Sequence, residues 1–315
     1  MRYLDDEFIW AQKYRPRTVK DCILPEKTKE IALGIVDKGF LPNLLLAHPS
    51  GGCGKSTLAM AICEDLGVDY ISINASLDAN IDSLRNNVRT HASTLSFSGN
   101  KKAIIWEEAD AIPIATQNAM RAFMEEYSSN CSHILTANYK HKIIPQIQSR
   151  CDSLEFSITA SERPKIARQI LKRCIQILKV EGVEYVESAI VELIIQKFPD
   201  FRNVLNALQG YSGNGKIDAG VLITLEETVF KELIGYLKNK EFTQMRKWLI
   251  ENNDIDSATL FDSLYKTSYD NLKPSAIPEL VLILAKYQSY VSQVANQEIN
   301  TAACLTELMM LDGWN

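Results

Sequence analysis

The chain has 315 residues, of which 46% are hydrophobic and 23% charged, and its formal net charge is −5. These values are typical of a folded globular protein and exclude an intrinsically disordered chain. No apolar run approaches the length of a membrane span, and the acidic balance excludes a wholly basic nucleic-acid binder, so any contact with DNA must use a local patch. At this length two or three domains are expected.

The seven cysteines are scattered and form no C-x-x-C pair. The acidic residues at positions 5–7 break the first apolar run, so the start of the chain does not resemble a secretory signal. We therefore expect reduced thiols, no structural zinc and a cytoplasmic location.

The most specific motif follows the first predicted strand, 44–47. Residues 49–56 have the sequence P-S-G-G-C-G-K-S and lead into a predicted helix at 57–66. A strand, a glycine-rich turn and a helix leave backbone N–H groups pointing at one anion, so this segment predicts a nucleotide-phosphate site. Lys55 would meet the outer phosphates, and Ser56 holds the position whose hydroxyl normally ligates magnesium.

The spacing is that of a Walker A loop with one exception, because Pro49 replaces the usual first glycine. Gly52 and Gly54 remain where the backbone must approach the phosphates closely. The predicted phosphate-binding residues are Ser50, Gly51, Gly52, Cys53, Gly54, Lys55, Ser56 and Thr57.

Strand and helix signals alternate through the first half of the chain. The apolar runs lie at 44–47, 70–73, 103–106, 134–137 and 154–156. This alternation predicts an α/β fold with a mostly parallel, doubly wound sheet, in which ligands bind at the carboxyl ends of the strands.

The third predicted strand delivers two adjacent acids, Glu107 and Glu108, to that edge. Phosphoryl transfer needs one acid to hold the magnesium shell and another to orient or deprotonate the attacking water, and we assign Glu107 and Glu108 to these roles in that order. Such a pair alone is more often a solvated loop start than a catalytic pair, but the preceding Walker A loop favours the catalytic interpretation. Most such strands carry Asp at the first position, so the extra methylene of Glu107 is expected to shift the metal shell.

Beyond about Phe156 the strand signal stops and apolar residues recur at helical spacing. The predicted helical segments are 161–179, 189–197, 201–209, 226–238, 242–251, 258–267 and 278–310. The glycine-rich stretch 210–220 indicates a break between a small all-helical domain and a second one.

Further segments follow the Walker A loop in a fixed order: E-E-A-D at 107–110, Q-N-A-M-R-A-F-M-E-E-Y at 117–127, T-A-N at 136–138 and S-R-C at 149–151. Together they resemble the motifs of the AAA+ sliding-clamp loaders of DNA replication. The segment F-P-D-F-R at 198–202 and the compact length are most similar to the large, ATPase subunit of T4-like bacteriophage clamp loaders.

The resemblance covers essentially the whole chain and is strongest from Lys13 to Arg202. It implies an AAA+ P-loop NTPase core with a parallel sheet at 1–156, a helical lid domain at 157–225 and a helical collar domain for oligomerisation at 226–315.

The resemblance also implies roles for three polar residues. Asn138 would be the first sensor, an amide near the γ-phosphate or the attacking water. Arg150 would be an arginine finger that reaches the ATP of a neighbouring subunit, and Arg202 a second sensor on the lid. The ordinary alternatives are a loop cap for Asn138, a surface salt bridge for Arg150 and a helix-face cation for Arg202.

The segment K-Y-R-P at 13–16 matches the family segment that folds over the adenine side, although alone it could equally be a docking strand for a neighbouring element. The walls of the adenine site would be Tyr14, Arg15, Pro16 and Val19. By analogy with the family, Gln117 would relay DNA contact to the catalytic glutamate, Glu108.

Clamp loaders hold DNA phosphates with basic residues, so binding should have low sequence preference and high salt sensitivity. Ile112 and Ile114, at a predicted helix start, are candidates for a clamp-facing surface, although a buried hydrophobic staple explains either equally well. The candidate DNA contacts are Arg85, Arg89, Lys101, Lys102 and Arg121.

The sequence therefore predicts an ATPase subunit, with ATP and Mg²⁺ as cofactors, that opens a sliding clamp and loads it onto primer-template DNA. Its expected partners are further copies of itself and a distinct small subunit in a hetero-oligomeric ring, a pentamer, acting in the host cytoplasm if phage-encoded and not at a membrane. Two alternatives stay open: another AAA+ DNA remodeller, such as a helicase loader or branch-migration motor, and an ATP-binding structural subunit that does not hydrolyse.

Overall fold

The computed structural model describes residues 8–75, 88–93, 101–213, 215–218, 225–252, 255, 257–291, 293–294 and 296–314. The chain divides into two compact units, residues 1–219 and 220–315, each with hydrophobic clusters of its own. Within the described ranges, none of the helices combines the length and the apolar character that a membrane crossing requires.

The N-terminal unit is built on a five-stranded parallel sheet with the order β2-β3-β4-β1-β5. Its strands are β1 (Leu44–Ala47), β2 (Tyr70–Asn74), β3 (Lys102–Glu107), β4 (Cys131–Ala137) and β5 (Asp152–Glu155). The strand order reverses at β1, and in open parallel sheets such a reversal leaves a ligand crevice beyond the carboxyl ends of the strands. The predicted α/β class and parallel sheet are confirmed.

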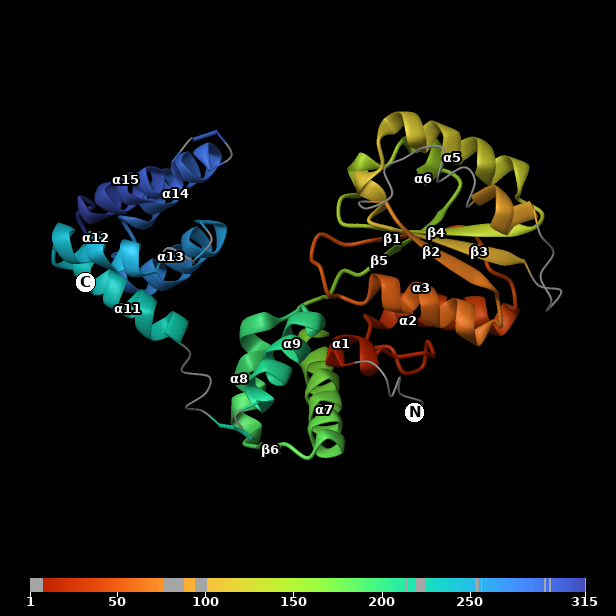
Figure 1. Ribbon diagram of the computed structural model, residues 1–315, viewed down its shortest axis with the longest axis horizontal. Coiled ribbons are helices and arrows are strands. Elements are labelled where there is room, and N and C mark those ends of the chain that lie inside the picture. The colour runs from red at the N-terminus through yellow and green to blue at the C-terminus, as the bar shows by residue number, and fades with distance from the viewer. Residues whose placement is uncertain are drawn as a thin grey trace. The chain divides into compact units, whose positions relative to one another are not determined.

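Both faces of this sheet are covered by helices (Figure 1). On one side lie α2 (Glu26–Lys38) and α3 (Lys55–Asp65), and on the other α5 (Ile114–Glu126) and α6 (Pro145–Gln148). Successive side chains of a strand point to opposite faces, so Leu44 and Leu46 join the cluster on the α3 side while Leu45 joins the cluster on the α5 side. Burial on both faces explains why the strands are apolar throughout rather than alternating.

A helical portion of the same unit follows β5. It contains α7 (Arg163–Glu181), α8 (Glu187–Lys197) and α9 (Phe201–Ser212), with a short parallel pair, β6 (Glu184–Tyr185) and β7 (Lys216–Ile217). The predicted break at 210–220 begins too early, because α9 runs through Gly210 and ends at Ser212. The two strands were not predicted, since two residues are too few to show an alternating pattern.

The beginning of the described chain is attached to these helices. Gln209 on α9 accepts a hydrogen bond from the backbone N–H of Trp10 at 2.9 Å and donates one to the carbonyl of Phe8 at 2.7 Å. Lys13, in the helix α1 (Trp10–Lys13), pairs with Glu181 of α7 at 2.7 Å. The segment that carries K-Y-R-P is thereby attached to α7 and α9.

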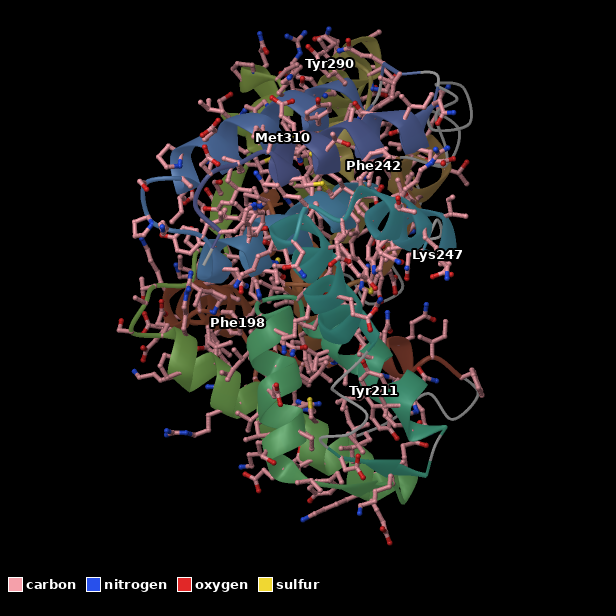
Figure 2. All side chains as sticks on the ribbon, turned by 90° about the vertical axis from the view of Figure 1, so that its left-hand side faces the viewer. Phe198, Tyr211, Phe242, Lys247, Tyr290 and Met310 are labelled. Atoms are coloured by element: carbon pink, nitrogen blue, oxygen red, sulfur yellow. The ribbon has the colours of Figure 1, made fainter. Side chains whose placement is uncertain are left out.

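The described residues of the C-terminal unit form helices, with one isolated antiparallel bridge between Leu272 and Trp314. Its helices are α11 (Leu225–Lys238), α12 (Phe242–Glu251), α13 (Ser257–Asn271), α14 (Ile277–Tyr290) and α15 (Gln297–Met309). The predicted helical stretch at 278–310 is two helices, and the second begins at a new cap where Asn296 accepts from the backbone of Ile299 at 3.2 Å. Phe242, Tyr290 and Met310 project from the surface of this unit (Figure 2).

Candidate active site

The phosphate loop lies between β1 and α3, as the motif predicts. Gly52 and Gly54 have φ angles of +64° and +95°, in the left-handed region that favours glycine. The helix α3 begins at Lys55, directly after Gly54. The N-terminal end of α3 therefore faces the loop, which is the arrangement that binds anions through backbone N–H groups and the helix dipole.

Lys55 ties the loop to the end of β4. Its ammonium group donates to the carbonyls of His48 and Ser50, both at 2.9 Å, and to Oδ1 of Asn138 at 2.8 Å. These bonds place the cation and the amide at the carboxyl ends of adjacent strands. The two predicted residues are thus brought together at the mouth of the phosphate loop.

Glu107 lies beside the hydroxyl of Ser56. Ser56 Oγ donates to one carboxylate oxygen of Glu107 at 2.9 Å, and Ser72 Oγ on β2 donates to the other at 2.6 Å. Hydroxyl and carboxylate oxygens are the ligands that Mg²⁺ prefers, so Ser56 and Glu107 would be suited to hold a magnesium ion, which would supply positive charge near the phosphates. No sequence motif points to Ser72, which holds the longer side chain of Glu107 in place.

Glu108 turns away from β3. Its φ and ψ angles are +54° and 43°, a left-handed conformation that is uncommon for residues other than glycine and often occurs at functional sites. Its backbone N–H donates to the hydroxyl of Thr136 at 3.3 Å, and its side chain is exposed at the cavity. The adjacent Asp110 accepts from the backbone N–H groups of Asn138 and Tyr139, both at 3.2 Å, and so fixes the start of the loop after β4.

A cavity joins the phosphate loop, the acids and the lid. The predicted site residues that line it are Tyr14, Arg15, Pro16, Gly51, Gly52, Cys53, Gly54, Lys55, Ser56, Thr57, Glu107, Glu108, Asn138 and Arg202. Val19 is fully buried in the cluster on the α3 side and does not line it, so its assignment as a wall of the adenine site needs correction. Ser50 also lies outside the lining, and its carbonyl accepts from Lys55.

The lid contributes more to this cavity than the sequence indicated. Besides Arg202, the lining includes Arg173 of α7, whose guanidinium is buried and donates to the carbonyl of Asp21 at 3.0 Å. Tyr14 contacts the Glu181 carboxylate through its hydroxyl. Arg173 lies in the middle of a helix and belongs to no sequence motif. Only the three-dimensional structure shows that it faces the site.

Burial changes the acid–base character of two residues at the loop. Burial, with a smaller contribution from the Lys55 ammonium, lowers the pKa of His48, so its imidazole is neutral at neutral pH. Ser50 donates its backbone N–H to Nδ1 of this ring at 3.1 Å. Burial also raises the pKa of the Cys53 thiol, which is therefore protonated and a poor nucleophile.

Two further predicted residues, Arg150 and Gln117, lie outside the cavity. Arg150 is exposed, donates to the carbonyl of Gln146 at 2.6 Å and pairs with Glu125. Gln117 is 2% exposed, and its amide bonds to backbone groups of residues 112, 142 and 144. Gln117 thereby fixes the segment that follows Asn138. This segment connects Gln117 to the site.

The candidate clamp and DNA contacts have different exposures. Ile112 is 5% exposed and packs in the core, so it is a buried staple and not part of a docking surface, whereas Ile114 is 67% exposed. Arg89 is exposed, and Arg121 on α5 is half-buried.

The remaining basic candidates are also differently placed. Lys101 donates to the carbonyl of Ser128 at 2.8 Å and lies over the ring of Phe40. Lys102 is buried and is not suited to phosphate contact. Arg85 falls outside the described residues.

A phosphate loop after β1, acids at the end of β3 and an arginine-bearing helical lid define an AAA+ ATPase. The AAA family model, described as the ATPase family associated with various cellular activities, matches residues 45–158. A second model, the sliding-clamp-loader large subunit, AAA+ ATPase lid domain, matches residues 162–223.

The chain belongs to the sliding-clamp-loader large-subunit family. It is 35% identical over 98% of its length to 98% of the sliding-clamp-loader large subunit of Enterobacteria phage T4, and 34% identical over 96% of both chains to that of Escherichia phage RB69. The replication factor C small subunit of Archaeoglobus fulgidus is 33% identical over 81% of this chain and 78% of its own. The solved RuvB Holliday junction branch migration motor of Thermotoga maritima, at 15% identity, a TM-score of 0.56 and 91% coverage of both chains, shares the fold.

Proposed function

We propose that this chain is the ATP-hydrolysing large subunit of a clamp loader, which uses ATP to open a sliding clamp and place it on primer-template DNA. The observation that carries the proposal is the convergence of Lys55, Glu108, Asn138 and Arg202 on one cavity in a chain of this family. We divide the chain into an ATP-binding domain at 1–156, a lid at 157–225 and a collar at 226–315.

Each residue of the cavity has a distinct task in this proposal. Lys55 and the loop N–H groups bind the outer phosphates. Ser56 and Glu107 would hold Mg²⁺, which supplies neutralising charge to the phosphate oxygens. Glu108 accepts a proton from the attacking water, and Asn138, held by Lys55, orients that water or the γ-phosphate.

Arg150 acts in a neighbouring copy. Its side chain lies outside the cavity of its own chain and is anchored at the surface by Gln146 and Glu125, which is where a finger serving another subunit has to be. Hydrolysis on this basis requires assembly, with further copies of this chain and a distinct small subunit in a pentameric ring. The relatives encoded by bacteriophages support action in the host cytoplasm.

The test is ATP turnover per chain against protein concentration, with and without clamp and primer-template DNA. Turnover should rise with concentration, clamp and DNA, and Arg150→Ala should lower it at least about 100-fold, since an arginine finger contributes roughly 10³ or more to phosphoryl transfer. Arg168→Ala, a loss of charge at another exposed position, is the matched control and should leave turnover unchanged.

Other results would select another function. Turnover that responds to DNA but ignores the clamp would indicate a different AAA+ DNA remodeller. Absence of turnover in every assembly would indicate a structural subunit that only binds ATP. Full turnover of Arg150→Ala would remove the finger from the mechanism.

A further inference from the structure

Asp200 begins the lid helix that carries Arg202. Its Oδ1 accepts the backbone N–H of Asn203 at 2.9 Å, which makes Asp200 the N-cap of α9. An N-cap side chain fixes the first turn of a helix by satisfying a backbone donor that has no partner within the helix. Arg202 is the second residue of α9 and lines the nucleotide cavity. The cap therefore determines the position of the backbone from which the Arg202 side chain extends.

The same carboxylate lies against the phosphate loop. A Cβ built on Gly52 would collide with Oδ1 and Cγ of Asp200. Glycine at position 52 is therefore required for its positive φ and also to admit the cap of α9. One oxygen thus joins the first turn of the lid helix to the loop that holds the phosphates.

We propose that Asp200 is a positioning residue that sets the distance between Arg202 and the triphosphate by capping α9 while resting on Gly52. This role rests on the proposed function and adds one residue, Asp200, to the nucleotide site. An exposed arginine has many rotamers, and a defined helix start reduces the freedom that binding must remove. The role needs an acceptor oxygen of the right reach and not a negative charge, because asparagine caps helices as well as aspartate does.

A double-mutant cycle on nucleotide affinity tests this role. The dissociation constants of a fluorescent ATP analogue and its ADP counterpart are measured on the full chain. Arg202→Ala should weaken ATP about 10-fold or more, the magnitude of a hydrogen bond to a charged group. Asp200→Ala should cause most of that loss by itself but less than about 2-fold further loss in the Arg202→Ala background, because residues that act as one unit are not additive.

Two further variants separate positioning from general destabilisation. Asp200→Asn should recover ATP affinity to within about 3-fold of the wild type, because the capping oxygen is retained. Asn296→Ala removes the equivalent cap of α15 in the C-terminal unit and should leave ATP affinity unchanged. If Asp200→Ala does not fold, the cycle is run with Asp200→Ser. The serine hydroxyl still caps α9, but its side chain is too short to contact Gly52. The same non-additive loss of ATP affinity is then expected.

Additive losses, an Asp200→Asn variant as weak as Asp200→Ala, unchanged affinity in Asp200→Ala, or an equal loss in Asn296→Ala would each overturn the role. The binding cycle requires neither turnover, clamp nor DNA. A chain that bound ATP as described but loaded no clamp would refute the proposed function while leaving the Asp200 result readable.

Discussion

In the N-terminal unit several polar contacts converge on one cavity, whereas the ion pairs among the described residues of the C-terminal unit lie at the surface. Lys55 bonds Asn138 at 2.8 Å, and Lys286 of the C-terminal unit pairs with Glu307 at the same distance. The first contact joins the ends of two strands beside a phosphate loop, and the second links α14 to α15 over an apolar core. Two contacts of the same length can therefore serve different purposes. Polar residues that converge on one cavity indicate a reaction site, whereas charged pairs on a surface do not.

The largest expected difference between the units comes from removing each lysine. Lys55→Ala should lower ATP turnover on the order of 10³-fold, about 4 kcal/mol, because the phosphates lose a cation and Asn138 loses its partner. Lys286→Ala should leave turnover unchanged and have little effect on stability, since its pair is exposed. Steady-state ATPase assays with urea unfolding compare the two, and equal losses of turnover would contradict the distinction.

The stability of the N-terminal unit should depend on histidine protonation, whereas that of the C-terminal unit should not. All four histidines of the chain lie in the N-terminal unit. Burial lowers the pKa of His133 to about 4, and its Nδ1 accepts from the indole of Trp106 at 3.1 Å. The unfolded chain takes up the proton near pH 6.5, before the folded chain does, so the stabilisation is complete above pH 6.5 and is lost as pH falls toward 4.

The loss attributable to His133 should reach about 3 kcal/mol, from a difference of about 2.5 pKa units. Hydrogen exchange resolved by peptide, corrected for intrinsic rates, should show steeper loss of protection in β3 and β4 than in α11–α15 between pH 6.5 and 4.5. His133→Gln, which keeps an acceptor for Trp106, should flatten this dependence, and the exposed His141→Ala should not. A slope unchanged by His133→Gln would assign the acid sensitivity to other groups.

The two units also differed in how far their structure could be predicted. The phosphate loop, the five strands and the acids at the end of β3 could be predicted from local patterns. A strand buried on both faces is a short run of consecutive apolar residues, and a phosphate loop is a short glycine-rich motif. The helices of the C-terminal unit were predicted as helices, but the turn before Asn296 was missed because its apolar spacing resembles that of a continuing helix.

The residues that sequence reasoning missed act through contacts between distant segments. Ser72 on β2 and Arg173 on α7 meet the site from elements without a motif. Asp200 stands inside the F-P-D-F-R segment, but the pattern assigned a role only to Arg202. Val19 was predicted as a wall of the adenine site, and Ile112 as either a clamp-facing residue or a buried staple, and both side chains are buried. An apolar residue in a loop can face either way, and only the packing of the sheet decides. Motifs thus locate the reaction, and tertiary packing selects the residues that hold the motif in place.

The smallest expected effect concerns one such supporting residue, Ser72. The Glu107 carboxylate is shared between Ser56 and Ser72, so the longer side chain at the usual Asp position gains a second anchor on β2. Ser72→Ala should raise the Mg²⁺ concentration for half-maximal turnover by about 5-fold, the value of one hydrogen bond near 1 kcal/mol. Ser289→Ala, which removes a hydroxyl that bonds a helix carbonyl in the C-terminal unit, is the matched control and should have no effect.

The cycle with Glu107→Asp decides whether Ser72 acts through Glu107. The shorter aspartate cannot span both hydroxyls, so Ser72→Ala should add less than about 2-fold to the Mg²⁺ requirement in that background. An equal shift in both backgrounds would mean that Ser72 affects Mg²⁺ by another route, for example by changing β2 itself. A shift confined to the Glu107 background would show that the departure from aspartate is accommodated by a neighbouring strand, and that the metal position need not move to accept it.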